Sequence, residues 1–314
     1  MIRVAVVGAG SFGRNHVRVV SESSRAELKY VVDTDAGRLK EHSAIGASSY
    51  RDIIGKVDAA VVAVPTVAHA EVACALLEAG IDVLVEKPIA LTLEEADRMI
   101  AAADRHGRVL QTGHLERFNP VITALESMAT LPLFFEVHRM SVFTLRSLDI
   151  DVVLDLMIHD LDIVLALARG KLREIRAAGI SILSPKVDIA NVRLEFDDGC
   201  IANLTASRVS TDRVRKLRLF QPGQYISADY AKQEGAVFTV GGDEGISFEK
   251  LDVTPAEPLK RQFDAFLDSV ETRLPPKLDG PTARRTLETA LAIIAKIEEH
   301  AGVVAKTLAS GWKP

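Results

Sequence analysis

A glycine-rich turn near the N-terminus constrains this chain more than any other feature. It matches the spacing G-x-G-x-x-G, directly after a short apolar run at residues 2–7 and before a helical pattern. In that spacing the first glycine makes a tight turn, the second lets the backbone approach a pyrophosphate, and the third lets the helix pack on the strand. The turn therefore predicts a dinucleotide site. Its residues are Gly8, Gly10, Ser11, Phe12 and Gly13.

An acidic residue at the end of the second apolar run refines the choice of dinucleotide. Asp33 closes this run, 20 residues beyond Gly13, where a carboxylate accepts hydrogen bonds from the adenosine ribose hydroxyls. The same carboxylate repels the 2′-phosphate of NADP, so we expect NAD. Thr34 and Arg38 lie nearby and keep NADP as the less favoured alternative.

Residues 1 to about 115 alternate short β-branched runs with helical patterns, which is typical of a parallel sheet covered by helices. The expected strands are residues 2–7, 28–32, 59–64, 82–86 and 109–112. Helical patterns follow the first four, as in Leu93–His106, and such right-handed connections build a doubly wound sheet. We therefore expect residues 1–118 to form an α/β Rossmann domain.

Beyond about residue 119 strand-like segments follow one another, which predicts an antiparallel sheet. The expected strands are residues 134–142, 173–183, 189–196, 201–209, 214–220, 226–231 and 236–240. Asp198-Gly199 is a turn signal between two of them. Helical patterns flank the sheet at residues 151–168, 259–272 and 282–300. Residues 119–314 are thus expected to form a C-terminal α+β domain with a large, mainly antiparallel open sheet.

Charge and composition argue against several classes of protein. The chain has 38 Lys and Arg against 43 Asp and Glu, a net charge of −5, which argues against a nucleic acid or an anionic membrane as the main partner. No apolar run approaches the ~18 residues of a membrane helix. The two cysteines, Cys74 and Cys200, supply neither a disulfide framework nor a zinc cluster. We expect a cytoplasmic protein whose chemistry comes from side chains and a bound organic cofactor.

The tripeptide Glu86-Lys87-Pro88 closes the fourth expected strand, at the carboxyl edge where open α/β sheets bind ligands. A lysine held there can donate a hydrogen bond to a reacting oxygen, and burial lowers a lysine's pKa toward neutrality. The alternative is a surface Glu–Lys pair before a loop proline, which also permits a cis peptide bond. We assign to the cofactor site, in addition to the turn, Asp33, Pro65, Thr66, His69, Glu86 and Lys87.

The segment that begins at Asp151 combines an apolar helical pattern with three polar residues. Its apolar side chains nearly surround it, which predicts a largely buried helix. Asp155, His159 and Asp162 stand at i, i+4 and i+7 and so share one stripe. Buried carboxylates are costly unless they are paired, metal-bound or in a wet site, so a structural network, a metal site and a catalytic site remain open. We favour the catalytic interpretation, in which Asp155 orients His159 for acid–base chemistry, and assign no metal.

Together these features resemble the glucose–fructose oxidoreductase, inositol dehydrogenase and rhizopine catabolism (Gfo/Idh/MocA) family. The resemblance spans essentially the whole chain: the glycine turn, Glu86-Lys87-Pro88, and a D-x-x-x-H helix in an antiparallel second domain. It implies an NAD(P)-dependent dehydrogenase acting on CH–OH groups. It also implies that Lys87 and His159 flank the reacting carbinol and that Asp155 is the partner of the histidine.

Two further segments, residues 113–120 and 155–160, resemble the nucleotide-sugar 3-dehydrogenases of that family. This resemblance implies oxidation of carbon 3 of a UDP-N-acetylhexosamine in 3-amino-sugar biosynthesis. The substrate contacts that we assign are His114, Glu116, Arg117, Asn119, Arg146 and Asp162. From the residues alone, the group at 114–119 fits an ion-pair cluster between the domains equally well. Likewise Arg139, Arg146 and Arg208 suit either a diphosphate or a solvated sheet edge.

The chain also departs from the wider family pattern, which often has two glycines before the helix and D-x-G-x-H within it. Ile150-Asp151 and Met157 stand there instead, which weakens the case for a generic sugar or inositol substrate. The alternatives are a dehydrogenase of inositol or a free sugar, and a non-catalytic regulator that senses a nicotinamide or a sugar. We expect a homodimer or homotetramer through the C-terminal sheet, with Val192, Val214, Leu217 and Leu219 among its interface residues.

Overall fold

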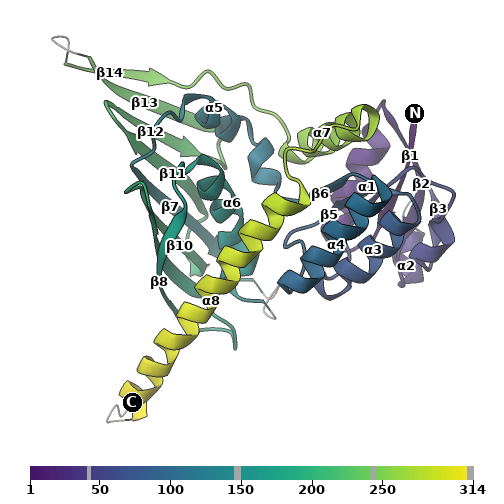
Figure 1. The fold of residues 1–314 in the computed structure, drawn as a ribbon, viewed down its shortest axis with the longest axis horizontal. Helices are drawn as coiled ribbons and strands as arrows, with labels where there is room; N and C mark the ends of the chain where they lie inside the picture. Colours follow the sequence, from purple (N-terminus) through teal and green to yellow (C-terminus); the bar gives the residue numbers. More distant parts are fainter. Residues whose placement is uncertain (41–43, 145–149, 242–244, 310–314) are drawn as a thin grey trace. The chain divides into compact units, whose positions relative to one another are not determined.

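Two sheets organise this protein, one in each of two structural units. The computed structural model describes residues 1–40, 44–144, 150–241 and 245–309 (Figure 1). The first unit comprises residues 1–115 and 257–287, and the second comprises residues 116–256 and 288–314. Within the described ranges, no helix is long and apolar enough to cross a membrane.

The first unit contains a six-stranded parallel sheet in the order β3-β2-β1-β4-β5-β6. Its strands are β1 (Ile2–Val7), β2 (Ala26–Val32), β3 (Ile45–Ala47), β4 (Ala59–Val62), β5 (Asp82–Val85) and β6 (Leu110–Thr112). Its helices and 3-10 turns are α1 (Gly13–Glu22), α2 (Ala36–Leu39), η1 (Tyr50–Ile53), η2 (Thr66–Ala68), α3 (His69–Glu78) and α4 (Leu93–His106). This strand order confirms the doubly wound Rossmann prediction. The short strand β3 was not predicted.

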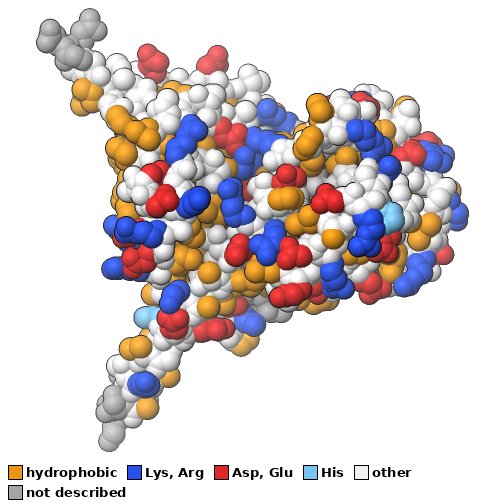
Figure 2. Space-filling view, viewed as in Figure 1, with side chains coloured by type: hydrophobic (Ala, Val, Ile, Leu, Met, Phe, Trp, Pro, Cys, Tyr) orange, Lys and Arg blue, Asp and Glu red, His pale blue; other side chains and the backbone are white. Residues whose placement is uncertain are grey.

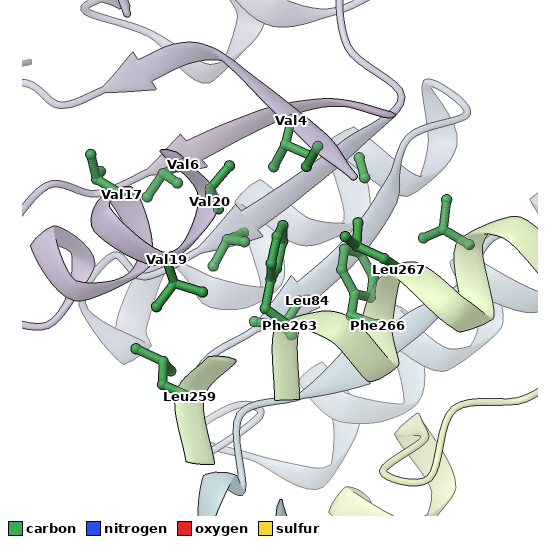
Figure 3. Packing of buried hydrophobic residues seen from close by; sticks show 14 of the residues in the cluster. Val4, Val6, Val17, Val19, Val20, Leu84, Leu259, Phe263, Phe266 and Leu267 are labelled. Atoms are coloured by element: carbon green, nitrogen blue, oxygen red, sulfur yellow. The ribbon is translucent and has the colours of Figure 1, made fainter. Parts of the chain in front are cut away.

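Helix α7 (Pro258–Thr272) belongs to the first unit, although the sequence division after residue 118 placed it in the second domain. Phe263, Phe266 and Leu267 of α7 join valines of β1 and α1 in one buried cluster (Figure 3). The amphipathic pattern of this helix shows that one face is buried, but it does not show which sheet the chain has returned to. The position of α7 could therefore be read only from the structure.

The second unit contains an eight-stranded sheet in the order β14-β13-β12-β11-β7-β10-β9-β8. Its strands are β7 (Phe134–Val142), β8 (Leu172–Ile180), β9 (Ile189–Phe196), β10 (Ile201–Ser210), β11 (Val214–Gln221), β12 (Gln224–Asp229), β13 (Glu234–Gly241) and β14 (Gly245–Lys250). The other elements are η3 (Leu115–Phe118), α5 (Pro120–Met128), η4 (Val153–Met157), α6 (Ile158–Leu167) and α8 (Gly280–Ala309), which starts in the first unit. Among the described strand pairs of this sheet only β7–β10 is parallel, so the predicted mainly antiparallel sheet is confirmed.

The two faces of this sheet differ in a way that corrects the expected interface residues. Helices α5 and α6 lie against one face (Figure 1), and Val192, Leu217 and Leu219 are fully buried. These three residues are therefore core residues of one chain. The other face carries a row of aromatic rings across five strands, with centroids 4.8–5.9 Å apart. The rings of this aromatic row belong to Phe134, Phe220, Tyr225, Phe238 and Phe248.

The segment predicted as one helix from residue 151 to residue 168 starts with a π-helical turn. This turn is η4, and α6 follows it directly. The N–H of Ile158 donates to the carbonyl of Val153, five residues back. Because apolar residues surround the segment on nearly every side, the sequence indicates burial but offers no single face from which the helical pitch can be read. Asp155 lies inside the widened turn and His159 lies in α6. The two residues therefore do not have the i, i+4 relation of a regular α-helix that the sequence predicted.

Asp188 anchors the turn between β8 and β9 and is completely buried. Its carboxylate accepts hydrogen bonds from the N–H groups of Ile182 and Leu183, both at 2.7 Å. The hydroxyl of Ser184 donates to it at 2.6 Å, and the N–H of the same residue donates at 3.0 Å. Burial by itself raises the pKa of this carboxyl, but the Ser184 hydroxyl and the three N–H donors outweigh it and lower the pKa of Asp188 to about 2.

We predict that Asp188→Asn lowers the free energy of unfolding at pH 7 by about 2 kcal/mol, because an amide cannot accept all of these hydrogen bonds. Since the pKa is lowered by folding, this stabilisation is present above pH 4 and is lost as the pH falls toward 2. Urea unfolding at pH 7, 4 and 3 measures it, with the exposed Asp212→Asn as control. Equal stability of wild type and Asp188→Asn at pH 7 would contradict this account.

Candidate functional site

The glycine turn has the shape that a pyrophosphate requires. A Cβ added to Gly13 would lie 1.8 Å from the carbonyl oxygen of Gly8, and a Cβ added to Gly8 would lie 2.5 Å from that of Ala63. By contrast, the nearest atom to a Cβ on Gly10 is Nη1 of Arg38, 3.7 Å away. Gly10 thus leaves open space above the backbone, at the N-terminal end of α1 where free N–H groups attract an anion. The turn fits the diphosphate of a dinucleotide.

Asp33 stands at the end of β2 with its carboxylate held in place. Its Oδ2 accepts the N–H of Ala9 at 2.8 Å, and its Oδ1 accepts the N–H of Asp35 at 2.9 Å. Burial acts to raise the pKa of Asp33, but these two N–H groups and the guanidinium of Arg38, 3.3 Å away, lower it overall. The carboxylate is therefore ionised at neutral pH, as the interaction with ribose hydroxyls requires. Arg38 is half exposed beside it.

The remaining cofactor candidates of the first unit differ in exposure. Ser11, Phe12 and Pro65 are exposed, and Thr66 is half-buried. His69 is only 1% exposed, and its ring lies between two backbone carbonyls. Nδ1 is 3.0 Å from the oxygen of Pro88, and Nε2 is 3.0 Å from that of Val64. Burial lowers the pKa of His69 against the opposing effect of these carbonyls, and the ring bridges two loops inside the unit.

Lys87 is the one partly exposed residue in the otherwise buried run Ile81–Ala90. The preceding Glu86 is buried, and its Oε1 lies 2.7 Å from Nε2 of His16 on α1. Its Oε2 accepts the backbone N–H of Lys87 at 3.2 Å. The Lys87–Pro88 peptide bond is cis. His16 was not predicted as a site residue; its signal in the sequence is a histidine among the valines of α1.

Buried charges gather around Glu116 in the second unit. Its Oε1 lies 3.2 Å from Nη1 of Arg139 and 3.4 Å from Nη1 of Arg215, and Nδ2 of Asn119 donates to Oε2 at 3.3 Å. Arg139 also makes two hydrogen bonds to Asp160, at 2.7 and 3.0 Å. Burial raises the pKa of Asp160 although Arg139 opposes it. The Arg139–Asp160 pair fastens helix α6 to strand β7, immediately beside His159.

A second ion-pair group involves Arg117. Its Nε lies 2.6 Å from Oε1 of Glu126, and its Nη1 lies 3.4 Å from Oδ2 of Asp162. Four of the six substrate candidates, Glu116, Arg117, Asn119 and Asp162, thus have ionic or hydrogen-bond partners within the second unit. This arrangement fits the ion-pair alternative, with the cluster inside one unit instead of between domains. His114 is buried in the first unit, and Arg146 lies outside the described residues.

Arg139 and Arg208, the two described arginines among those expected to bind a diphosphate, are also engaged internally. Arg139 is buried between Glu116 and Asp160. Arg208 is buried and donates to the carbonyls of Ile150 and Val187, so it holds the chain that leads into η4. Arg215, which was not predicted as a site residue, keeps its side chain partly exposed.

Asp155 and His159 occupy the junction of η4 and α6. Asp155 is half-buried, and His159 is buried to 9% exposure. A π-helical turn often marks a functional site because it displaces side chains from the regular helical positions. Across the described residues, no group of three or more His, Cys, Asp or Glu side chains is placed to hold a metal ion. The structure thus places both expected proton-transfer residues at this irregular turn.

Comparison with known proteins gives a consistent result for both halves of the chain. Residues 2–114 match the family model described as "Oxidoreductase family, NAD-binding Rossmann fold". Residues 134–221 match the model of the GFO/IDH/MocA C-terminal domain. The two matches lie in the parallel sheet and the antiparallel sheet respectively, so the likeness includes both units.

Individual relatives cover nearly the whole chain. UDP-N-acetylglucosamine 3-dehydrogenase from Acidithiobacillus ferrooxidans is 34% identical, over 95% of this chain and 97% of its own length. Its solved structure has a TM-score of 0.90 and covers 95% of this chain and 98% of that one. Myo-inositol 2-dehydrogenase from Thermotoga maritima is 26% identical over 96% of this chain and 98% of its own length.

We predict that Gly10→Ala weakens NAD binding by about tenfold or more, because the added methyl group occupies the space for the pyrophosphate. The fold should persist, since the nearest atom to that Cβ is 3.7 Å away. Gly13→Ala is the contrasting variant, which should lower the melting temperature because its Cβ would meet a carbonyl at 1.8 Å. Isothermal titration calorimetry with NAD and a thermal melt measure both effects. NAD affinity unchanged in Gly10→Ala would refute the assigned phosphate position.

Proposed function

Because this chain is a member of the Gfo/Idh/MocA family of NAD-dependent dehydrogenases, we propose that it oxidises carbon 3 of a UDP-N-acetylhexosamine. The product would be the 3-keto nucleotide sugar that an aminotransferase converts to a 3-amino sugar. The observation that supports this most is the likeness to UDP-N-acetylglucosamine 3-dehydrogenase, which extends over both units with a TM-score of 0.90. It joins the resemblance already present in residues 113–120 and 155–160.

In this proposal three side chains act on the reacting hydroxyl group. His159 accepts the hydroxyl proton, and Asp155 orients the imidazole. Lys87 donates a hydrogen bond to the same oxygen and stabilises the negative charge that develops before the carbonyl forms. Bound NAD supplies the acceptor for the hydride that leaves the carbon. The partly exposed position of Lys87 in a buried run and the junction site of His159 support these roles.

Oxidation of inositol is the second candidate. Myo-inositol 2-dehydrogenase from Thermotoga maritima also matches nearly the whole chain, although at 26% identity. Both reactions remove hydrogen from a secondary alcohol on a six-membered ring, so the same three side chains serve either one. The substrates differ in charge, because a nucleotide sugar carries a diphosphate and inositol carries none.

We also propose that two copies of the chain associate through the aromatic row of the eight-stranded sheet. Phe220 is 36% exposed and Phe248 is 55% exposed, and Val240 and Ile246 stand beside them. Hydrophobic side chains gather over the strand ends β12–β14 in Figure 2. A contiguous apolar surface of this kind usually marks an interface, and a two-fold axis would stack one row on its copy.

A cytoplasmic location completes the proposal. Cys74 and Cys200 are free thiols, and burial raises the pKa of Cys200 to about 12. A thiol of this kind stays protonated and unreactive, and free thiols are common where the compartment is reducing.

We predict that the wild-type protein reduces NAD with UDP-N-acetylglucosamine at least about tenfold faster than with myo-inositol or free N-acetylglucosamine. Lys87→Met should lower kcat by about 100-fold or more while NAD affinity stays within about threefold, because the lost hydrogen bond acts in the transition state. NADH absorbance at 340 nm measures the rates, and NADP in place of NAD tests the role of Asp33. A preference for myo-inositol would favour the second candidate. NAD binding without turnover on any of the three would favour the sensing regulator.

We predict that Phe248→Asp shifts the protein from a dimer or larger assembly toward the monomer, because it buries a charge in the apolar contact. Leu274→Asp is the matched control, since Leu274 is 65% exposed but lies outside the aromatic row. Light scattering after size-exclusion chromatography, at about micromolar concentration, distinguishes the states. A wild-type protein that is monomeric under these conditions would overturn the proposed interface.

A further inference from the structure

We propose that two buried histidines, His16 and His69, hold the backbone on either side of Lys87. They thereby position its ammonium group for the hydrogen bond to the reacting oxygen. Neither histidine is a catalytic residue in this proposal, because each acts on Lys87 through a neighbouring residue. The inference rests on the proposed role of Lys87 in oxidation and adds the positioning residues for it.

The first contact acts on the N-terminal side of Lys87. His16 is 1% exposed, and its Nε2–H donates to Oε1 of Glu86 at 2.7 Å. The other carboxylate oxygen, Oε2, accepts the N–H of Lys87 at 3.2 Å. A Cβ on Gly113 would lie 2.7 Å from that same oxygen, so the carboxylate is packed tightly against backbone. Both carboxylate oxygens are bonded, and Gly113 packs against the carboxylate. Glu86 therefore fixes the orientation of the peptide plane between residues 86 and 87.

The second contact acts on the C-terminal side of Lys87. Nδ1 of His69 lies 3.0 Å from the carbonyl oxygen of Pro88, and Nε2 lies 3.0 Å from that of Val64. A neutral imidazole has one N–H, and in this proposal it is on Nδ1, where it donates to Pro88 in the loop after β5, while the ring packs against the loop after β4. Both loops are at the carboxyl edge of the parallel sheet, where ligands bind in this type of fold.

The need for such positioning follows from the lysine side chain itself. Four methylene groups separate the Lys87 backbone from its charge, and each free torsion angle lets the ammonium group move away from the reacting oxygen. Fixing the backbone on both sides of Lys87 removes the movement of the ammonium group that comes from the backbone. A displacement of about 1 Å can cost about 100-fold in rate, so loss of either contact should appear in kcat.

Strand β5 offers a matched control for the effect of removing a buried carboxylate. Asp82 begins the strand and Glu86 follows its last residue. Asp82 is also buried, and it binds Nη1 of Arg273 at 2.7–2.8 Å and the N–H of Val109 at 2.8 Å. It lies at the opposite edge of the sheet from Lys87. Asp82→Asn should therefore destabilise the fold without reaching the reaction.

The first experiment compares Glu86→Ala, Glu86→Gln and Asp82→Asn. We expect Glu86→Ala to lower kcat by about 10- to 100-fold, a larger factor than any rise in the KM for NAD or for the sugar. Glu86→Gln keeps an acceptor for the Lys87 N–H and should recover most of kcat. Asp82→Asn should keep kcat within about twofold even where its melting temperature falls as far as that of Glu86→Ala. A parallel loss of kcat in Asp82→Asn would show that stability alone is responsible and would overturn the proposal.

The second experiment separates the two contacts of His69. Asparagine places its amide nitrogen near the position of Nδ1, and glutamine places its nitrogen near that of Nε2. We expect His69→Asn, which keeps a donor toward Pro88, to retain at least about fivefold more kcat than His69→Gln, which places its donor toward Val64. The reverse order, or equal kcat in the two variants, would show that the contact to Pro88 does not position Lys87.

A readout without substrate distinguishes failure of this proposal from failure of the proposed function. Hydrogen exchange of the peptide that contains Lys87, followed by mass spectrometry, should speed up at least about tenfold in Glu86→Ala and stay at the wild-type rate in Asp82→Asn. If exchange changes in this way but no alcohol is oxidised by the wild type, the positioning stands and the function is wrong. If the wild type is active and neither exchange nor kcat responds to Glu86→Ala, the positioning is wrong.

Discussion

The closure of the glycine turn on itself is the constraint on which the first unit depends. The backbone at Gly13 approaches the carbonyl of Gly8 so closely that a Cβ would lie 1.8 Å from it. This approach sets α1 directly against β1, and α1 in turn places His16 against Glu86. Because Glu86 holds the N–H of Lys87, the turn that fits the dinucleotide and the lysine proposed to act in the reaction are linked through one helix. A change in the turn would therefore affect both.

The main constraint in the second unit is a buried helix, α6, that carries polar residues. Burying ions is costly unless each has a partner, and removal of one partner costs about 3–5 kcal/mol. Arg139 and Asp160 meet this condition with two hydrogen bonds, and Glu116 supplies a further ion pair. The attraction between these charges and their hydrogen bonds act against the cost of desolvation. The same contacts hold α6 against β7 at the residue next to His159. The ion pairs thus define where the proposed base lies within its unit.

Local patterns predicted the sheets well because strand alternation and turn residues are local properties. The predicted bounds of β1, β7 and β9 agree with the structure, and the glycine turn has the close contacts that its spacing requires. Properties that depend on distant partners were not predictable in this way. Alternation showed that Leu217 lies on one face, but not that helices cover this face while aromatic rings occupy the other. The contacts of Arg139 and His16 likewise join segments far apart in the sequence.

The distribution of arginine bears on the proposed binding of an anionic sugar nucleotide by this acidic chain. An arginine that recognises a phosphate must keep donors free, whereas Arg139 and Arg208 are buried against carboxylates and carbonyls. Arg215 stands directly opposite Arg139 in the β7–β11 pair and is held by Glu116 at 3.4 Å. Burial and the neighbouring Arg139 lower its pKa, and Glu116 opposes them. Glu116 and Asp160 therefore have two effects. They pair with Arg139, and they allow Arg215 to lie beside it, partly exposed and positively charged.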